Sequence, residues 1–138
     1  MRTMAREQRK VIESLRHVAL FANCSDAELT EIDGLVSEIS IDTGRTLMSA
    51  GDGGLEFVVV VDGWASVTRD DEEIAKVGPG SFVGELALID KRPRTATVTA
   101  ITPMRLWVLH EGEFATLLGA VPCVKKKIEA AAGRRRRG

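Results

Sequence analysis

The chain has 138 residues, of which 44% are hydrophobic and 28% are charged, and its formal net charge is −1. This length suits one domain with one core, and the balance of residue types is typical of a globular protein rather than a disordered or membrane protein. A nearly neutral chain argues against a nucleic-acid-binding body, and no apolar run approaches the roughly 20 residues that span a bilayer.

The first segment, residues 1–40, is predicted to be helical. The N-terminus MRTMAREQRK is basic, but an amphipathic pattern follows it rather than the apolar core of a secretion signal, so we expect a cytoplasmic protein. Apolar residues recur at helical spacing in two stripes, over residues 11–19 and residues 29–39. Between them, Ser25 and Glu28 have the spacing of a capping box, which predicts the start of a helix.

The second segment, residues 41–110, is predicted to form strands. Short apolar runs alternate with Gly-rich or Asp-rich turns about every eight to twelve residues, a spacing typical of a β-sandwich or barrel. The β-branched run at residues 58–61 is followed by Asp-Gly, which favours a tight hairpin turn. Further turns are predicted at RDDEE (residues 69–73) and GPG (residues 78–80), and the last two strands are separated near Pro103.

The third segment, residues 111–138, is predicted to return to helix. Its second helix begins at Pro122, since proline is tolerated in a first turn. The chain ends in the basic runs KKK (residues 125–127) and RRRR (residues 134–137). We expect the final run to be a solvated, frayed end, with weak contact to an anionic membrane surface or to nucleic acid as the alternative.

Cysteine usage predicts no covalent or metal site. Cys24 and Cys123 are far apart in the sequence, without CxxC spacing and without nearby histidines. We therefore expect neither zinc ligands nor a disulfide in a reducing compartment. His17 and His110 are isolated from each other, so they do not supply the clustered ligands that a metal-dependent cupin enzyme needs.

The stretch GELALIDKRPRT, residues 84–95, has the features of an anion site. The planar fork of Arg94 can make two parallel hydrogen bonds to phosphate oxygens. Gly84 lets the backbone approach a ligand, and the N–H groups that open the following short helix are unsatisfied. A phosphate would repel Glu85, so this carboxylate is expected to face a neutral donor such as a sugar hydroxyl, or to pair with Arg94. The hydroxyl of Thr95 completes a set of residues that suits a nucleotide.

Three motifs carry a family resemblance. GDGGLEFVVVVDG, VGPGSFVGELALI and RPRTATV resemble, in order and spacing, the cyclic nucleotide-binding domains of catabolite-activator-type regulators, cyclic-nucleotide-dependent kinases and gated channels. The likeness runs from about Leu20 to about Val124. It implies a single domain over residues 1–138, mainly β with flanking α-helices. Its centre would be an eight-stranded jelly-roll β-roll with a phosphate-binding cassette at residues 84–95.

The resemblance also implies roles for the cassette residues. The Arg94 guanidinium would hold the cyclic phosphate, and Glu85 would bind the ribose 2′-hydroxyl. Leu86 and Ala87 would offer backbone N–H groups, and Thr95 would lie beside the phosphate and near the base. Cyclic AMP is the expected ligand. Cyclic GMP is the alternative, because a threonine at this place can also meet a guanine amine.

The expected function is that of a regulatory sensor, not an enzyme. A lid over the base is expected from the C-terminal helix, where the apolar candidates are Ile128, Ala131 and Ala132. Since no further domain follows this helix, we expect the signal to pass to a separate, unidentified protein partner. The alternative is an interaction or assembly protein of the same fold that has lost nucleotide binding.

Overall fold

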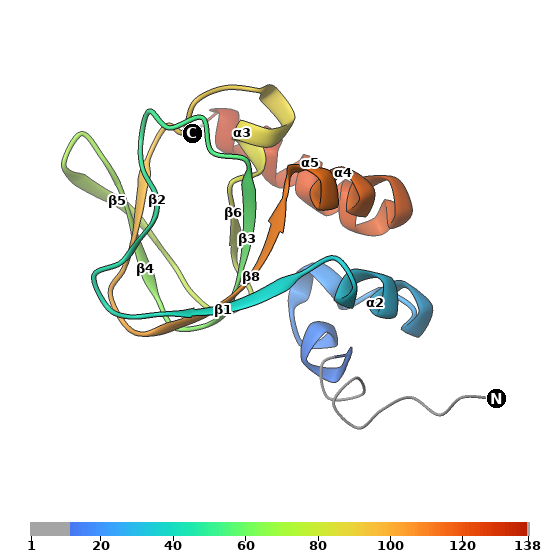
Figure 1. The fold of residues 1–138 in the computed structure, drawn as a ribbon. Helices are drawn as coiled ribbons and strands as arrows, with labels where there is room; N and C mark the ends of the chain where they lie inside the picture. Colours follow the sequence, from blue (N-terminus) through green and yellow to red (C-terminus); the bar gives the residue numbers. More distant parts are fainter. Residues whose placement is uncertain (1–11, 138) are drawn as a thin grey trace.

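The structure is a computed structural model that describes residues 12–137. Helical segments at both ends of the chain flank a β-roll (Figure 1). After a helical turn over residues 12–16, the elements are η1 (Ala19–Phe21), α2 (Asp26–Asp33), β1 (Ser37–Ile41), β2 (Thr46–Met48), β3 (Glu56–Asp62), β4 (Ala65–Arg69), β5 (Glu72–Val77), β6 (Phe82–Val83), α3 (Glu85–Asp90), β7 (Thr97–Ala100), β8 (Met104–His110), α4 (Glu111–Ala120) and α5 (Pro122–Arg137).

The roll consists of two antiparallel sheets. Within residues 12–137 each sheet has four strands, in the orders β1-β8-β3-β6 and β2-β7-β4-β5. This arrangement confirms the predicted eight-stranded, mainly β fold with flanking helices. No helix in this part of the chain has the length and apolarity needed to cross a membrane.

The sequence of strand β3 is almost continuously apolar because both faces of the strand are buried. Successive side chains of a strand point to opposite faces. Phe57 and Val59 pack into the core that the sheet shares with the helices, whereas Val58 and Val60 pack inside the roll. All four are at most 3% exposed. The sheet β1-β8-β3-β6 is therefore covered on both faces at its centre.

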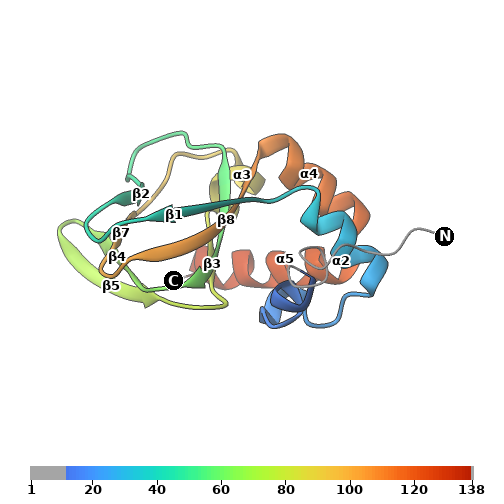
Figure 2. The same ribbon diagram turned by 60° about the horizontal axis from the view of Figure 1, so that its bottom comes forward.

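Helix α5 runs from the N-terminal helices to the β-roll (Figure 2). Its residues Val124 and Ile128 are fully buried in the helical core together with Leu15 and Phe21 from the N-terminal segment. The other end of α5 lies beside α3 (Figure 1). Helix α5 thus connects the N-terminal helical segment to α3, the short helix within residues 84–95.

Most of the predicted turns and helix starts agree with the structure, but the hairpin predicted at Asp62-Gly63 is wrong, because β3 and β4 on either side of it lie in different sheets. Ser25 N donates to Glu28 Oε1 at 2.8 Å, and Glu28 N donates to Ser25 Oγ at 3.1 Å, which confirms the capping box. The β4–β5 hairpin turns at Asp70 and Asp71, whose φ values are 53° and 63°. A two-residue hairpin with both central φ values positive has the twist that its strands require, and aspartate tolerates this conformation. Helix α5 begins at Pro122, as expected.

The prediction of helix up to Ile39 is wrong. Helix α2 ends at Asp33, and strand β1 begins at Ser37. Ile39 is paired with Leu106 of β8 and is 43% exposed. The apolar residues of β1 resemble a continuation of the helical spacing, because a strand at the edge of a sheet also carries isolated apolar residues.

Candidate functional site

A cavity of about 490 Å³ lies between α3, the segment that follows it, and the second sheet. This volume is in the range of small-molecule sites. One wall is apolar and comes from strands β2, β4, β5, β6 and β7, through Met48, Val67, Ile74, Ala75, Val77, Val83 and Val98. A second, polar wall carries most of the residues that the sequence singled out: Gly84, Glu85, Leu86, Ala87, Arg94 and Thr95. Arg69, Arg92 and Arg135 also line the cavity.

Gly84 fixes how the polar wall begins. It precedes α3 with a φ of 101°, in the left-handed region that favours glycine. A Cβ at this position would lie 2.5 Å from the Glu56 carbonyl oxygen and 2.9 Å from Arg94 Nη1. The absent side chain therefore leaves the space that the Arg94 guanidinium occupies.

Arg94 is held in place by backbone groups. Its Nη1 donates to Gly84 O at 2.9 Å and its Nη2 donates to Glu56 O at 2.7 Å. Its own backbone N–H donates to Asp52 O at 2.7 Å, and its carbonyl accepts from Gly51 N at 2.8 Å. Turn and strand together fix both the backbone and the head group of this arginine.

The charge of Arg94 is buried without a direct counter-charge. The residue is 8% exposed, and it makes no ion pair with a carboxylate in residues 12–137. Burial lowers the pKa of the guanidinium, and the more distant charges of Glu56, Glu85 and Asp52 oppose that shift. A guanidinium has five N–H donors, and two carbonyls do not exhaust them. The side chain can therefore receive an anion from the cavity.

Glu85 pairs with a residue that the sequence did not suggest. Its Oε1 accepts a hydrogen bond of 2.5 Å from Arg135 Nη1, near the end of α5. Arg135 Nη2 donates to Phe82 O at 2.9 Å, and the guanidinium lies over the Phe82 ring at 5.1 Å from its centroid. The sequence offered a neutral donor or Arg94 as the partner of Glu85, and pairing with Arg94 is wrong.

The second oxygen of the Glu85 carboxylate has no partner. The residue is 1% exposed, and Oε2 is buried without a hydrogen bond from any described residue. A buried acceptor that is left unsatisfied costs about 1–3 kcal/mol, and more when it is charged. The carboxylate thus offers a place for one further donor.

A second arginine of the basic run also contacts α3. Arg136 donates to both oxygens of Asp90, from Nε at 2.8 Å and from Nη2 at 2.6 Å, and Arg92 Nη2 donates to Oδ2 at 3.1 Å. The hydrogen bond from Arg136 and the charges of both arginines hold the pKa of Asp90 below its usual value. The expectation of a frayed basic end is wrong for these residues, which belong to the last turn of α5.

The remaining predicted residues divide into two groups. Leu86, Ala87 and Thr95 line the cavity, and Thr95 is exposed. The lid candidates Ile128, Ala131 and Ala132 are buried at 0–4% exposure and lie outside the cavity walls. Helix α5 reaches the cavity through Arg135 instead.

Sequence reasoning missed Arg135 and the apolar wall. The signal for Arg135 was present only as a run of four arginines at a helix end, in which no member is distinguished. For the apolar wall, Val67 on β4 and Ile74 and Ala75 on β5 have nothing in the sequence that distinguishes them from other strand residues. These residues become part of the cavity wall only because the fold places β4 and β5 beside the cavity.

Chemically, the cavity combines three features in one place. It offers a fixed cation with spare donors, a buried carboxylate oxygen that needs a donor, and an apolar wall. A ligand that satisfies all three has an anion, a neighbouring hydroxyl group and a flat apolar part.

The family model described as "Cyclic nucleotide-binding domain" matches residues 38–120. The cAMP-dependent protein kinase regulatory subunit of Yarrowia lipolytica is 32% identical over 114 residues, which are 83% of this chain and 30% of that protein.

Two solved structures show the same fold. The N-terminal domain of a transcriptional regulator from Streptomyces coelicolor A3(2) is 36% identical, with a TM-score of 0.69, and the match covers 90% of this chain and 92% of that one. The cAMP-bound structure of PfPKA-R (141-441) has a TM-score of 0.78 at 25% identity, over 91% of this chain and 47% of that one. The chain spans less than a third of the length of the curated relatives that it matches.

Proposed function

The chain belongs to the cyclic nucleotide-binding domain family, and we propose that its cavity binds cyclic AMP as the signal of a regulatory sensor. The Yarrowia relative is named as cAMP-dependent, and PfPKA-R was solved with cAMP bound, which supports adenine as the base. Cyclic GMP is the competing ligand, because the Thr95 hydroxyl on the cavity wall can hydrogen-bond to either purine.

The observation that carries this proposal is that two buried charged groups on one wall of the cavity lack full sets of partners among the described residues. Among residues 12–137, Arg94 is a buried cation without a direct counter-charge, and Glu85 has a buried carboxylate oxygen without a donor. Both residues line the same cavity. A cyclic nucleotide meets both needs at once, since its phosphate is an anion and its ribose carries one free hydroxyl group.

The phosphate is assigned to Arg94 and to the start of α3. The spare N–H groups of the guanidinium form charge-assisted hydrogen bonds with the phosphate oxygens. The backbone N–H groups of Leu86 and Ala87 lie in the first turn of α3, where a helix has no internal acceptors for them. The ribose 2′-hydroxyl donates to Oε2 of Glu85.

The base is assigned to the apolar wall of β4 and β5. Ile74 lines the cavity and is 49% exposed. Covering this side chain and Val67 with a purine removes apolar surface from water, which favours binding by about 25 cal/mol for each Å² buried. The same wall accepts adenine and guanine, so the choice of base depends on polar contacts at Thr95.

The expected affinity is near micromolar. Hydrogen bonds to charged groups contribute roughly 1.5–3 kcal/mol each, and three or four of them must outweigh the cost of association. A net free energy of about −8 kcal/mol corresponds to a Kd near 1 μM.

The sensor's output is assigned to α5. In the proposed complex, Arg135 contacts one oxygen of the Glu85 carboxylate and the ligand's hydroxyl group contacts the other. A bound ligand therefore changes the surroundings of the Arg135–Glu85 contact, which holds α5 on α3. A ligand shifts such an arrangement only by binding its two states with different affinity. The altered surface of α5 would be read by a separate protein partner.

Isothermal titration calorimetry with matched nucleotides tests the proposal. We expect cyclic AMP to bind near micromolar, 2′-deoxy cyclic AMP to bind about tenfold or more weakly, and 5′-AMP, which lacks the ring, to bind weakest. Cyclic GMP measured in the same way decides the base. No heat with either cyclic nucleotide, at protein concentrations far above micromolar, would favour an assembly protein that keeps the fold without the ligand.

A further inference from the structure

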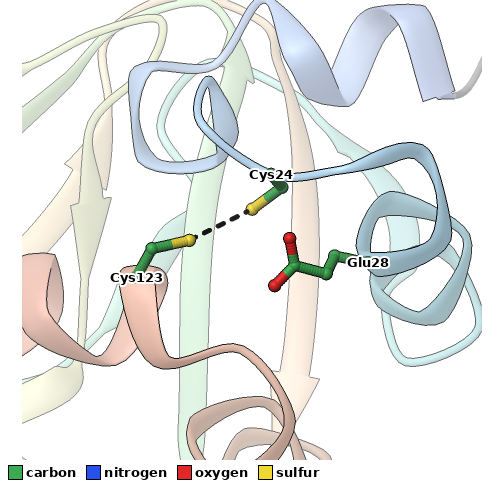
Figure 3. Close-up of side chains that lie close together, drawn as sticks. All are labelled: Cys24, Glu28 and Cys123. Carbon is green, nitrogen blue, oxygen red and sulfur yellow. Dashed lines mark hydrogen bonds between the residues drawn. The ribbon is translucent and has the colours of Figure 1, made fainter.

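We propose that Cys24 and Cys123 are an oxidation-sensitive pair that forms a disulfide between the N-terminal helices and the start of α5. The two residues are 99 positions apart in the sequence, yet their Sγ atoms are 3.8 Å apart (Figure 3). Both are free thiols in the structure. A disulfide brings the sulfurs to about 2.0 Å, so bond formation requires only a small approach of the two side chains.

The location of the pair combines burial with access. Cys24 lies in the connection between η1 and α2 and is 3% exposed. Cys123 is the second residue of α5 and is half-buried. An oxidant from solvent therefore reaches Cys123 first, and Cys24 is the neighbouring thiol that can respond.

Neighbouring contacts hold the two segments together without the disulfide. One turn after Cys123, Lys127 Nζ donates to Ala19 O and to Asn23 Oδ1, both at 2.8 Å. Val124, next to Cys123, is fully buried in the helical core. The sulfurs are therefore close because the surrounding packing fixes both segments, not because two flexible side chains meet at the surface.

The chemistry balances with a hydroperoxide as the oxidant. The Cys123 thiol takes one oxygen atom from hydrogen peroxide to give a sulfenic acid and water. The Cys24 sulfur then attacks the Cys123 sulfur. The S–S bond forms, the S–OH bond breaks, and the hydroxyl leaves as water with the Cys24 proton. Burial first, and then the neighbouring Cys123 and Glu28, raise the pKa of Cys24 to about 12, so its proton departs only in this second step.

A metal site is the rival use of the same cluster. The Glu28 carboxylate points toward both sulfurs (Figure 3), and one ligand atom from each of the three residues lies within 4.8 Å of the others. Zinc requires both thiols to stay ionised in the bound state, whereas disulfide formation needs the Cys24 proton to leave only as the S–S bond forms. The Oε1 atom of Glu28 already accepts the N–H of Ser25, and the Lys127 ammonium lies beside the cluster. These contacts favour the disulfide.

The bond would affect the sensor through α5, and this step rests on the proposed function. The start of α5 would be fixed to the N-terminal segment, while its end holds Glu85 and Asp90 through Arg135 and Arg136. Any movement of α5 that admits or releases the ligand would then be slower. We expect both the association and the dissociation rate of cyclic AMP to fall severalfold in the oxidised protein.

The first experiment needs no nucleotide. The fully reduced chain is treated with hydrogen peroxide, and its intact mass and its alkylatable thiols are measured. We expect a mass loss of two hydrogen atoms, protection of both cysteines from alkylation, and a higher midpoint of thermal unfolding that dithiothreitol reverses. The variant Cys123→Ser should show none of these changes. Overoxidation of Cys123 without the internal bond, or a disulfide between two chains, would overturn the proposal.

The metal alternative has its own readout. Reduced protein is dialysed against zinc chloride, and bound zinc is measured by elemental analysis in the wild type and in Glu28→Gln, which keeps the acceptor for Ser25. We expect no stoichiometric zinc in either protein, and disulfide formation in both. Stoichiometric zinc in the wild type that blocks oxidation and is lost in Glu28→Gln would identify a metal site instead.

The kinetic experiment separates this inference from the proposed function. Release of a fluorescent cyclic AMP analogue is followed in the reduced and oxidised wild type and in Cys123→Ser. Slower release only in the oxidised wild type supports the coupling through α5. Equal release rates despite a proven disulfide would overturn that coupling, whereas absence of binding in every sample would contradict the nucleotide assignment and leave the disulfide result standing.

Discussion

The Arg135 guanidinium near the end of α5 donates to Oε1 of Glu85, while Oε2 of the same carboxylate is buried and has no partner in the part of the chain that the structure describes. One oxygen of Glu85 is therefore bonded to α5, and the other is left for the cavity. The contact with Arg135 fixes the orientation of Glu85, and such preorganisation would lower the cost of binding the proposed ligand.

Replacing Arg135 should loosen the end of α5. In Arg135→Ala the buried Glu85 loses its donor, so we expect the free energy of unfolding to fall by about 1–3 kcal/mol. Hydrogen exchange should also become faster in the last turns of α5. The exposed neighbour Arg134 provides a control with the same change in charge, and Arg134→Ala should stay within about 0.5 kcal/mol of the wild type. Equal effects of the two variants would show that the contact with Glu85 contributes nothing.

Replacing Arg94 should abolish nucleotide binding. The variant Arg94→Leu removes the cation and its charge-assisted hydrogen bonds to the phosphate, and the backbone N–H groups of Leu86 and Ala87 do not replace them, so calorimetry should detect no binding of cyclic AMP. Arg94→Lys keeps the charge but loses the planar fork, and we expect it to bind at least about tenfold more weakly than the wild type. Circular dichroism should show the same fold in all three proteins. Wild-type affinity in Arg94→Leu would end the assignment of the phosphate.

The role of Glu85 can be isolated with a matched ligand. In Glu85→Gln the affinity for cyclic AMP should fall ten- to hundredfold, or about 1.4–2.8 kcal/mol. If Oε2 accepts the 2′-hydroxyl, this variant should bind 2′-deoxy cyclic AMP about as well as cyclic AMP, because the interaction is already lost. Additive losses from the variant and from the missing hydroxyl would place the ribose elsewhere.

A methyl group at Gly84 should act through crowding as well as strain. Gly84 and Gly44 both have positive φ values, 101° and 90°, so alanine at either position costs about 1–2 kcal/mol. At Gly44 nothing lies within 4 Å of the added Cβ, whereas at Gly84 it would meet Glu56 O at 2.5 Å and Arg94 Nη1 at 2.9 Å. Urea unfolding should show the larger loss in Gly84→Ala, and only that variant should lose cyclic AMP binding. Equal losses of stability would remove the crowding argument.

The contact between Arg136 and Asp90 predicts a pH dependence. Because Arg136 lowers the pKa of Asp90, the folded state gains stability from the ionised carboxylate above its usual pKa of about 3.9 and loses it as the pH falls through the lower folded value. The difference in thermal unfolding between the wild type and Asp90→Asn should therefore be full at pH 7, shrink as the pH falls below about 4, and vanish only below the lowered folded-state pKa of Asp90. Asp71→Asn, in the exposed β4–β5 turn, should follow the wild type throughout. A gap that persists in acid would assign the difference to packing.

Features that depend only on residues close together in the sequence could be predicted. The turns at Asp70 and Asp71 follow from short-range rules, and the cassette that contains Gly84, Glu85 and Arg94 is a contiguous motif. Strand β1 was missed because its edge position leaves the same scattered apolar residues as a helix.

Contacts between distant segments could not be predicted. Arg135 meets Glu85 across 50 positions, and Cys24 meets Cys123 across 99 positions. Both pairs depend on where α5 packs, and that is set by its buried face, which includes Ile128. The sequence shows that this face is apolar, but the identity of the surface it covers emerges only when the whole core is assembled.

Helix α5 has 16 residues and is therefore about 24 Å long. Because it is a single stiff rod with contacts at both ends, it acts as a lever. Pivoting it by about 10° around its start would swing its far end by roughly 4 Å, further than a hydrogen bond can stretch. A rotation too small to disturb the buried start of α5 would thus be large enough, at the cavity end, to separate Arg135 from Glu85.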